Sequence, residues 1–389
     1  MHFIDLKAQQ TQLLKTGVTL KEDIEKNIKK VIEHGQFISG PEVNELEIKL
    51  CKYTGVKNCI TLSSGTDALL VSLMALNIKN NDEVITTPFS FFATAEIIAL
   101  LGAKPVFVDI DKKSYNIDHT KIEKAITSKT KAIIAVSLYG QTADFKNINK
   151  IANKYNIPVI EDGAQSFGAT HHKIKSGALS TIGTTSFFPS KPLGGYGDGG
   201  ACFTNNDELA KKIRQISLHG QIKRYTHNEI GINGRLDTIQ AAILLSKIKI
   251  FDKEIKSREK IAKRYVKEFN RRDFYETPFI QHCNNSVYAQ FTIQINNREE
   301  VINLLKSKGI PTAIHYPSLL PDQKALNKKK LRINIFKNLL TKKNYKSFNL
   351  ENAKLAAKKV LSLPMHPLLK EDDQDLIIKS VIEAVKKIN

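Results

Sequence analysis

Apolar positions along the first half of the chain alternate between two spacings. Short apolar runs typical of buried strands cover residues 58–62, 83–87, 104–109, 131–140, 157–162 and 184–188. Helical spacing lies between them, over residues 93–101, 121–126 and 145–154. Because strands and helices alternate at this interval, the pattern predicts an α/β fold with a mostly parallel sheet and helices on both of its faces.

The two ends of the chain differ from this alternation. Residues 5–34 carry helical periodicity, which predicts an N-terminal helical arm. Beyond Phe251 the pattern predicts a long amphipathic helix, and then the elements strand 286–295, helix 298–306, strand 311–317 and helix 373–388. Since single cores stop growing at about 250 to 300 residues, we expect a large domain over 1–250 and a smaller C-terminal α/β domain over 251–389.

Composition narrows the class of protein. With 41% hydrophobic and 25% charged residues, the chain is typical of soluble globular proteins. A net charge of +20 suits nucleic acid, but the lysines are scattered along helices, which favours solvated faces and no nucleic-acid partner. A basic nucleic-acid-binding or regulatory protein without catalysis stays the alternative from another class.

Cysteines and termini carry little further chemistry. The four cysteines lie far apart with no CxxC pair, which predicts buried thiols and no metal site. No signal-peptide pattern opens the chain, and no apolar run reaches the length of a membrane span. We therefore expect a cytoplasmic protein that has no membrane partner.

Small, polar and aromatic residues follow the ends of several predicted strands. In parallel sheets, ligands bind beyond the carboxyl ends of the strands, so these side chains should converge on one rim. The residues are Gly65, Thr66, Phe91, Asp162, Gln165, Ser186 and Lys191.

Lys191 and Asp162 are the catalytic candidates. Lys191 precedes five glycines in residues 194–200, and a desolvated lysine is a nucleophile that forms a Schiff base with an aldehyde. A surface lysine before a flexible turn is the alternative. Asp162 ends an apolar strand and needs a cationic partner, such as a protonated pyridine nitrogen, unless it caps the following segment.

The other rim residues suit the same ligand. A helix that begins at Gly65 and Thr66 presents free N–H groups to a phosphate, although plain helix capping explains this turn equally well. The Ser186 hydroxyl suits the same phosphate. Phe91 suits stacking on an aromatic ring, with Phe89 and Phe92 as competitors and core packing as the default. A lysine, an acid and a phosphate cup together predict pyridoxal 5′-phosphate.

Long ordered motifs carry a family resemblance over nearly the whole chain. They include HGQFISGPEV, SSGTDAL, DEVITTPFSFFATAE, EDGAQSFGA, SFFPSKPLGGYGDGGA, INGRLDTIQAAIL, AIHYP and SLPMHP. The chain resembles the DegT/DnrJ/EryC1 sugar aminotransferases. This resemblance implies the PLP-dependent transferase fold of type I, which is like that of aspartate aminotransferase.

The resemblance also implies roles for individual residues. Lys191 would bind the cofactor covalently, Asp162 would pair with its pyridine nitrogen, and Phe91 would stack on its ring. Gln165 would lie beside the cofactor. The phosphate would be held by Gly65, Thr66 and Ser186. Asn233 and Arg235 would reach the site of the other subunit in a homodimer with shared active sites, Asn233 toward the cofactor and Arg235 toward the substrate. His315 and Tyr316 would line the sugar end.

The reaction implied is transamination of a 3-keto nucleotide sugar with L-glutamate. Glutamate would become 2-oxoglutarate, and the cofactor would alternate with pyridoxamine 5′-phosphate. Segments VSLYGQTADF and SVYAQFTIQINNRE are similar to those of family members that act on UDP-2-acetamido-2-deoxy-3-oxo-glucuronate, a precursor for bacterial lipopolysaccharide O-antigen. A dTDP-linked 3-keto-6-deoxy sugar and a UDP-linked 4-keto sugar are the alternative substrates.

Two features depart from the family pattern. Phe91 stands where relatives often have Tyr or Trp, which keeps stacking and removes a hydrogen-bonding group. The segment over residues 324–350 is longer and more basic than usual.

Overall fold

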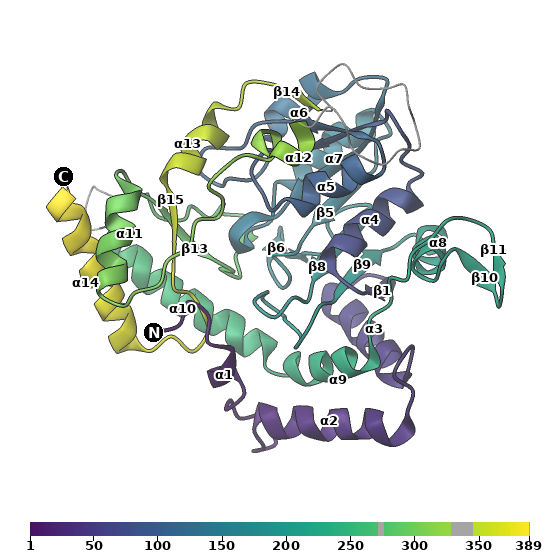
Figure 1. Cartoon of the computed structure of the whole chain (residues 1–389), viewed down its shortest axis with the longest axis horizontal. Coiled ribbons are helices and arrows are strands. Elements are labelled where there is room, and N and C mark those ends of the chain that lie inside the picture. The colour runs from purple at the N-terminus through teal and green to yellow at the C-terminus, as the bar shows by residue number, and fades with distance from the viewer. Residues whose placement is uncertain (271–275, 328–344, 389) are drawn as a thin grey trace.

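An eight-stranded sheet forms the centre of the protein (Figure 1). The structure is a computed structural model that describes residues 1–270, 276–327 and 345–388. The strand order of the sheet is β1-β9-β8-β5-β4-β2-β3-β14, and every pair is parallel except those made by β9. The strands are β1 (Asn58–Leu62), β2 (Glu83–Thr86), β3 (Lys104–Phe107), β4 (Thr130–Val136), β5 (Val159–Asp162), β8 (Ile182–Ser186), β9 (Gly200–Thr204) and β14 (Lys346–Ser347). The predicted mostly parallel α/β sheet is confirmed.

Helices cover both faces of this sheet because successive strand residues point to opposite sides. Ile134 packs with one face and Ile133 with the other. The first face carries α4 (Gly65–Ala75), α5 (Ala93–Leu100) and α8 (Asp207–Ser217). The second carries α6 (His119–Ala125), α7 (Phe145–Lys154), α3 (Pro41–Thr54) and α9 (Thr238–Lys247).

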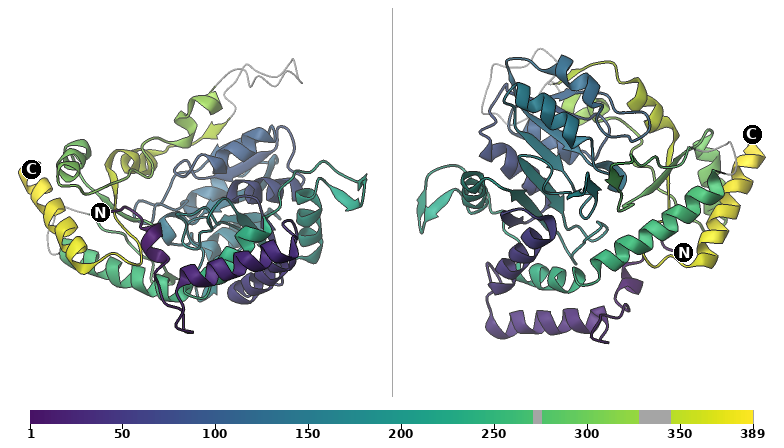
Figure 2. Two further views of the ribbon diagram at one scale, coloured as in Figure 1. Left: turned by 60° about the horizontal axis from the view of Figure 1, so that its bottom comes forward. Right: turned by 180° about the vertical axis from the view of Figure 1, so that it is seen from behind.

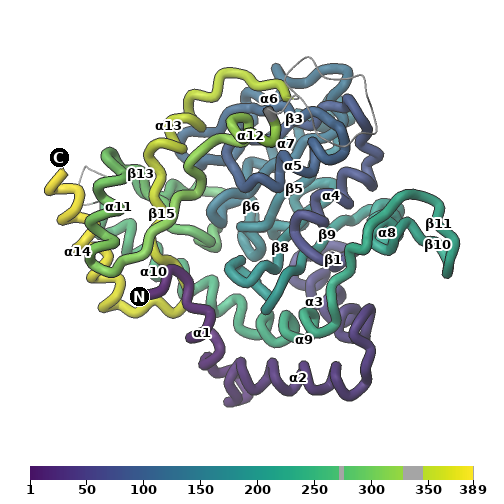
Figure 3. Tube along the Cα trace, viewed as in Figure 1, coloured from purple at the N-terminus to yellow at the C-terminus, as the bar shows by residue number. Residues whose placement is uncertain are grey.

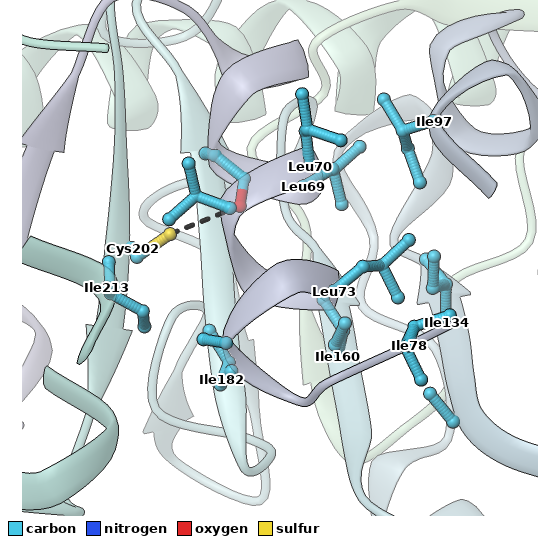
Figure 4. Close-up of a cluster of buried hydrophobic side chains, with 14 of the residues drawn as sticks. Leu69, Leu70, Leu73, Ile78, Ile97, Ile134, Ile160, Ile182, Cys202 and Ile213 are labelled. Carbon is cyan, nitrogen blue, oxygen red and sulfur yellow. Dashed lines mark hydrogen bonds between the residues drawn. The ribbon is translucent and has the colours of Figure 1, made fainter. Parts of the chain in front are cut away.

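The core beneath α4 is almost entirely aliphatic (Figure 4). Leu73 of α4 is fully buried there, and truncating such a leucine to alanine costs about 2 to 5 kcal/mol. Cys202 lies in the same cluster, where its thiol donates to the carbonyl oxygen of Ala68. Cys59 is also buried, but Cys51 and Cys283 are partly exposed, so the prediction of four buried thiols was wrong for two of them. All four are free.

The N-terminal region is not one continuous helix over residues 5–34. It forms a short α1 (Leu6–Gln9) and, after a turn, α2 (Leu20–His34), which begins at the capping box of Thr19 and Glu22. Helix α2 packs along α9, while the first residues of the chain run beside α10 (Phe251–Phe269) (Figure 3). The arm therefore bridges two parts of the chain.

A second hydrophobic cluster begins within α10, at Ile261, whereas Phe251 at the start of that helix packs with the cluster of α3 and α9. The second cluster joins α10 (Phe251–Phe269), β13 (Phe291–Gln294), α11 (Arg298–Ser307), β15 (Val360–Leu363) and α14 (Glu371–Ile388). Strand β13 pairs antiparallel with β15. The predicted strand over residues 311–317 does not form, because this stretch makes only an isolated bridge from Ala313 to Ser362. The division into domains at residue 250 stays a prediction.

Shorter elements complete the described chain. They are η1 (Leu138–Gly140), β6 (Thr170–His171), β7 (Ile174–Lys175), β10 (Gln221–Lys223), β11 (Thr226–His227), β12 (Asn284–Asn285), η2 (Leu320–Asp322), α12 (Lys324–Asn327) and α13 (Glu351–Lys359). The β10–β11 hairpin projects away from the rest of the molecule (Figure 2). Residues 328–344 of the basic segment lie outside the described residues. No helix in the described part of the chain is long and apolar enough to cross a membrane.

Candidate active site

Lys191 is held by a tightly wound loop after β8. Its backbone N–H donates to the carbonyl oxygen of Phe188 at 2.9 Å, and the Gly195 N–H donates to Phe187 at 2.7 Å. A Cβ at Gly194 would lie 2.4 Å from the carbonyl oxygen of Pro189, so only glycine fits this turn. The glycine-rich sequence therefore closes the loop and fixes where the lysine begins.

Burial lowers the pKa of the Lys191 amine, and the nearby Asp162 carboxylate raises it in part. Asp162 ends β5 and is 6% exposed. Burial raises the pKa of Asp162, whereas hydrogen bonds from Thr94 and Ala164 and the charge of Lys191 lower it. The two groups share one environment without a direct ion pair, as a ligand between them requires.

Asp162 is held by hydrogen bonds rather than used as a helix cap. The Thr94 hydroxyl donates to its Oδ2 at 2.8 Å, and the Ala164 N–H donates to its Oδ1 at 3.3 Å. No helix follows it directly, so the capping alternative does not apply. Thr94 is 1% exposed and was missed in the sequence, although it lies in the helix start that follows the Phe91 loop.

The start of α4 lies against the end of β8. Ser64 caps this helix, and its side chain and carbonyl oxygen bond the N–H groups of Asp67 and Ala68. Among the described residues, the N–H groups of Gly65 and Thr66 keep no such partner. A Cβ at Gly65 would lie 2.6 Å from the Cβ of Ser186, so the backbone and the serine form a close cradle. Free N–H groups at a helix start attract an anion.

Phe91 differs from its neighbours in exposure. Phe89 is fully buried and Phe92 packs against the core, whereas Phe91 is 57% exposed. Its ring centroid lies 6.5 Å from that of Tyr316. Of the three phenylalanines, Phe91 is thus the one with a free ring face near the rim.

Gln165, His315 and Tyr316 meet through Tyr139, a residue that the sequence analysis missed. The Tyr139 N–H donates to Oε1 of Gln165 at 2.9 Å, and Nε2 of Gln165 donates to the Tyr316 hydroxyl at 3.2 Å. The Tyr139 hydroxyl donates to the carbonyl oxygen of His315. Tyr139 follows β4, so the rule that ligands bind beyond strand ends points to it as well.

His315 also contacts the C-terminal part of the chain. Its Nδ1 lies 2.8 Å from the Ser362 hydroxyl at the end of β15. Burial and the charge of Lys191 lower the pKa of His315 to about 4. The imidazole is therefore neutral at physiological pH.

Asn233 and Arg235 lie in the irregular segment after the β10–β11 hairpin, where Asn233 makes an isolated bridge to Leu218. Nη2 of Arg235 donates to Oδ1 of Asn233 at 2.6 Å, and the Gly234 carbonyl accepts from Ser63 beside the α4 start. Asn233 is exposed, and Nε of Arg235 is buried without a partner among the described residues. The structure thus places both near the anion cradle but outside the Gln165 network.

One cluster of potential metal ligands lies elsewhere. His171, His172 and Cys283 offer ligand atoms within 4.8 Å of one another. However, Nε2 of His171 accepts from the Lys146 N–H at 3.2 Å, which leaves the ring proton on Nδ1, 2.7 Å from Oδ1 of Asn284. Since both ring nitrogens are occupied, the hydrogen bonding favours a structural histidine.

Known proteins resemble this chain over almost its full length. Residues 18–382 match the DegT/DnrJ/EryC1/StrS aminotransferase family. The UDP-2-acetamido-2-deoxy-3-oxo-D-glucuronate aminotransferase of Pseudomonas aeruginosa is 52% identical over 369 residues, which cover 95% of this chain and 96% of that protein.

Two solved structures share the architecture. A DegT DnrJ EryC1 StrS aminotransferase from Brucella abortus has a TM-score of 0.90 and 39% identity, with 99% of each chain covered. NtdA from Bacillus subtilis, with bound cofactor PMP, has a TM-score of 0.85 and 32% identity over 99% of this chain and 85% of that one. These matches confirm the predicted fold class.

Proposed function

Because the chain belongs to the DegT/DnrJ/EryC1/StrS aminotransferase family, we propose that it transfers an amino group from L-glutamate to the keto carbon of UDP-2-acetamido-2-deoxy-3-oxo-D-glucuronate. The observation that carries this proposal is the shared environment of Lys191 and Asp162 beside the anion cradle of α4. The product is a 3-amino nucleotide sugar for bacterial surface polysaccharide.

The residues present fit pyridoxal 5′-phosphate as the cofactor. Its phosphate suits the free N–H groups of Gly65 and Thr66 with the Ser186 hydroxyl, and its pyridine nitrogen suits Asp162. Phe91 offers a free ring face for stacking. When bound, the cofactor supplies an aldehyde that accepts an amine and a ring that withdraws electrons.

The chain itself supplies proton transfer and positioning. Lys191 holds or moves a proton at the α carbon of the amino donor, and its lowered pKa increases the neutral fraction that can act as a base. Asp162 is fixed by Thr94, so its charge is in place before the reaction. Gln165 is fixed from both sides, by Tyr139 and Tyr316.

The sugar end is assigned to His315, Tyr316 and Arg235. A neutral His315 and the Tyr316 hydroxyl suit sugar hydroxyl groups. The Arg235 fork suits a uronate carboxylate, and its unpaired Nε leaves a donor for a ligand.

A homodimer with shared sites fits the surface around Asn233. Ile222, Tyr225 and Ile230 of the projecting hairpin region are 53%, 81% and 85% exposed. Large exposed apolar side chains on a protruding hairpin suit an isologous contact with a second copy. In that arrangement Asn233 and Arg235 serve the partner's site.

The test offers the purified holoenzyme L-glutamate and a panel of keto-sugar nucleotides. We expect the UDP-linked 3-oxo uronate to regenerate the aldehyde form of the cofactor fastest, followed by absorbance. A dTDP-linked 3-keto-6-deoxy sugar and a UDP-linked 4-keto sugar serve as comparison substrates. Faster regeneration by either of them refutes the proposed substrate.

A further inference from the structure

A pocket beside Lys191 is lined mostly by residues that have no role in the proposed function. It lies where the N-terminal segment, the loop before Lys191, α10 and the segment after β15 meet, and it encloses about 270 Å³ of space that opens to solvent. Its polar lining consists of Asp5, Gln9, Ser190, Lys191, Arg258 and His366. Figure 1 shows the N-terminus beside α10.

Arg258 brings a buried cation to this pocket. It is 5% exposed, and its Nη1 contacts the carbonyl oxygens of Met365 and Tyr288 at 3.3 and 3.5 Å. Nε and Nη2 make no hydrogen bond, and the guanidinium makes no ion pair, in the part of the chain that the structure describes. A buried charge without a direct ion pair is costly, so Arg258 can gain from an anion that contacts its free N–H groups.

The charge of Glu254 offsets part of the effect of burial on the pKa of Arg258, but its carboxylate makes no direct contact with the guanidinium. Glu254 precedes Arg258 by one turn of α10, but its Oε1 accepts from Nε2 of Gln9 at 2.8 Å and from Nε2 of Gln12 at 2.6 Å. This contact fixes the N-terminal segment against α10. It also fixes the amide orientation of Gln9, because a carboxylate only accepts hydrogen bonds.

Two polar atoms of the pocket are left unpaired by this arrangement. Nδ1 of His366 and Oε1 of Gln9 are buried without hydrogen-bond partners among the described residues. His366 is 6% exposed, and burial and Arg258 lower its pKa to about 4, so the ring is neutral and can donate one N–H. Buried polar groups are almost always paired, so His366 is a sign of a ligand group that accepts a hydrogen bond, and Oε1 of Gln9 of a group that donates one.

We propose that this pocket binds a carboxylate of the amino donor, with Arg258 as its counter-ion and His366 and Ser190 as hydrogen-bond donors. The inference rests on the proposed transamination and adds the site for its donor. Lys191 borders the pocket, so a carboxylate there places the α carbon within reach of the amine that moves its proton.

The uronate sugar carries a carboxylate as well as glutamate, and the lining argues against the sugar as the ligand of this pocket. Neither Arg235, His315 nor Tyr316 borders the pocket. Asp5 also borders the pocket, with Oδ1 accepting from the Ala8 N–H at 2.8 Å, so the Arg258 charge has to offset Asp5 as well as the bound carboxylate.

The test uses glutarate, an unreactive dicarboxylate, and measures its binding to the holoenzyme by calorimetry. His366→Leu should weaken binding about 10-fold and Arg258→Gln about 100-fold, because hydrogen bonds to charged groups are lost. Arg264→Gln is the matched control, since Arg264 lies on the same helix and bonds Asp375 outside the pocket. It should bind glutarate like the wild type.

Measuring the rates of the glutamate and keto-sugar half-reactions separately distinguishes this inference from the proposed function. In His366→Leu the glutamate half-reaction should slow about 10-fold, while the pyridoxamine form should react with the keto sugar at the wild-type rate. Unchanged glutarate binding in both variants overturns the inference. Glucuronate that displaces glutarate, with the sugar half-reaction slowed, assigns the pocket to the sugar and also overturns it.

The same variants are also checked for correct folding. His366→Leu removes an unpaired buried nitrogen, so its thermal midpoint should equal or exceed that of the wild type. If Arg258→Gln does not fold, His366→Leu decides alone. A wild type that binds glutarate but converts no keto sugar refutes the proposed substrate and leaves the carboxylate pocket standing.

Discussion

The surroundings of Asp162 and those of Arg258 both adjoin Lys191, but they differ in how many hydrogen bonds the chain makes by itself. Asp162 accepts from Thr94 and Ala164, and nearby Gln165 is bonded at both ends of its amide. Around Arg258, in contrast, His366 and Gln9 each keep a buried polar atom without a partner among the described residues.

This difference distinguishes two kinds of binding region. A fully bonded polar network holds its groups in one geometry before any ligand arrives, which suits a cofactor that stays in place. An unpaired buried polar group costs about 1 to 3 kcal/mol, and a ligand that completes it recovers that cost. The second arrangement suits a substrate that enters and leaves.

Lys191→Ala should have the largest effect, because Lys191 belongs to both regions. Loss of the proton carrier should reduce both half-reactions by about 10² to 10⁴-fold, measured as single-turnover absorbance changes. Lys211→Ala, at an exposed lysine on α8, is the control and should be normal. A Lys191→Ala protein that converts glutamate at the wild-type rate contradicts the site.

Thr94→Val should disrupt the hydrogen-bonded surroundings of Asp162 and leave those of Arg258 intact. The Thr94 hydroxyl lowers the pKa of Asp162, so its loss raises that pKa further and moves the acidic limb of the rate profile to higher pH. A hydrogen bond to a charged group is worth about 1.5 to 3 kcal/mol, so turnover should fall about 10- to 100-fold.

Thr204→Val is the matched control for this change. Thr204 is 2% exposed and its hydroxyl donates to the carbonyl oxygen of Thr181 at 2.9 Å, in the same sheet but away from the rim. Comparable loss of turnover in both variants, without a shift of the profile in Thr94→Val, indicates a purely structural role for Thr94.

The sequence predicted the surroundings of Asp162 better than those of Arg258, for a physical reason. Asp162, Phe91 and Ser186 lie at or just after the ends of strands. Because those strands can be recognised in the sequence from their apolar runs, the edge of the sheet where these residues meet was predictable. The sheet and most helix bounds followed from the same periodicity. Strand β9 was missed because its glycine-rich start resembles a loop.

Arg258 and His366 escaped notice because their environment depends on packing between distant segments. In the sequence, Arg258 resembles the other cations on the polar side of an amphipathic helix. His366 resembles a residue of a turn that contains two prolines. Both residues become neighbours of Lys191 through packing: Arg258 donates to the Met365 carbonyl oxygen, and Gln9 docks onto Glu254 at the same pocket. Side-chain hydrogen bonds over such distances leave no periodic signal.

Tyr316→Phe should weaken the bonded region moderately. It removes the acceptor of Nε2 of Gln165, a loss of about 0.5 to 1.5 kcal/mol, so cofactor affinity should fall about 3- to 10-fold. Equilibrium dialysis of the cofactor measures this. Tyr115→Phe is the control, because the Tyr115 hydroxyl accepts from Gln294 at 2.9 Å instead. Equal losses in both variants exclude a specific role for the Tyr316 hydroxyl.

The smallest expected effect is on stability: besides slowing the glutamate half-reaction, His366→Leu should change the pH dependence of unfolding, and only in acid. The pKa of His366 lies at about 4 in the folded protein and near 6.5 when it is not buried. The unfolded chain therefore binds more protons between these values, and wild-type stability should decline as pH falls from 6.5 to 4.

Without this histidine, part of that decline should disappear. His315 has the same shift and is kept in the variant, so the remaining slope serves as an internal reference. Urea unfolding at pH 7.5, 6, 5 and 4.5 should show the two proteins diverging only on the acidic side, with the variant the more stable. Parallel curves would mean that the His366 ring is already hydrated or paired, and the contrast between the two regions around Lys191 would then be lost.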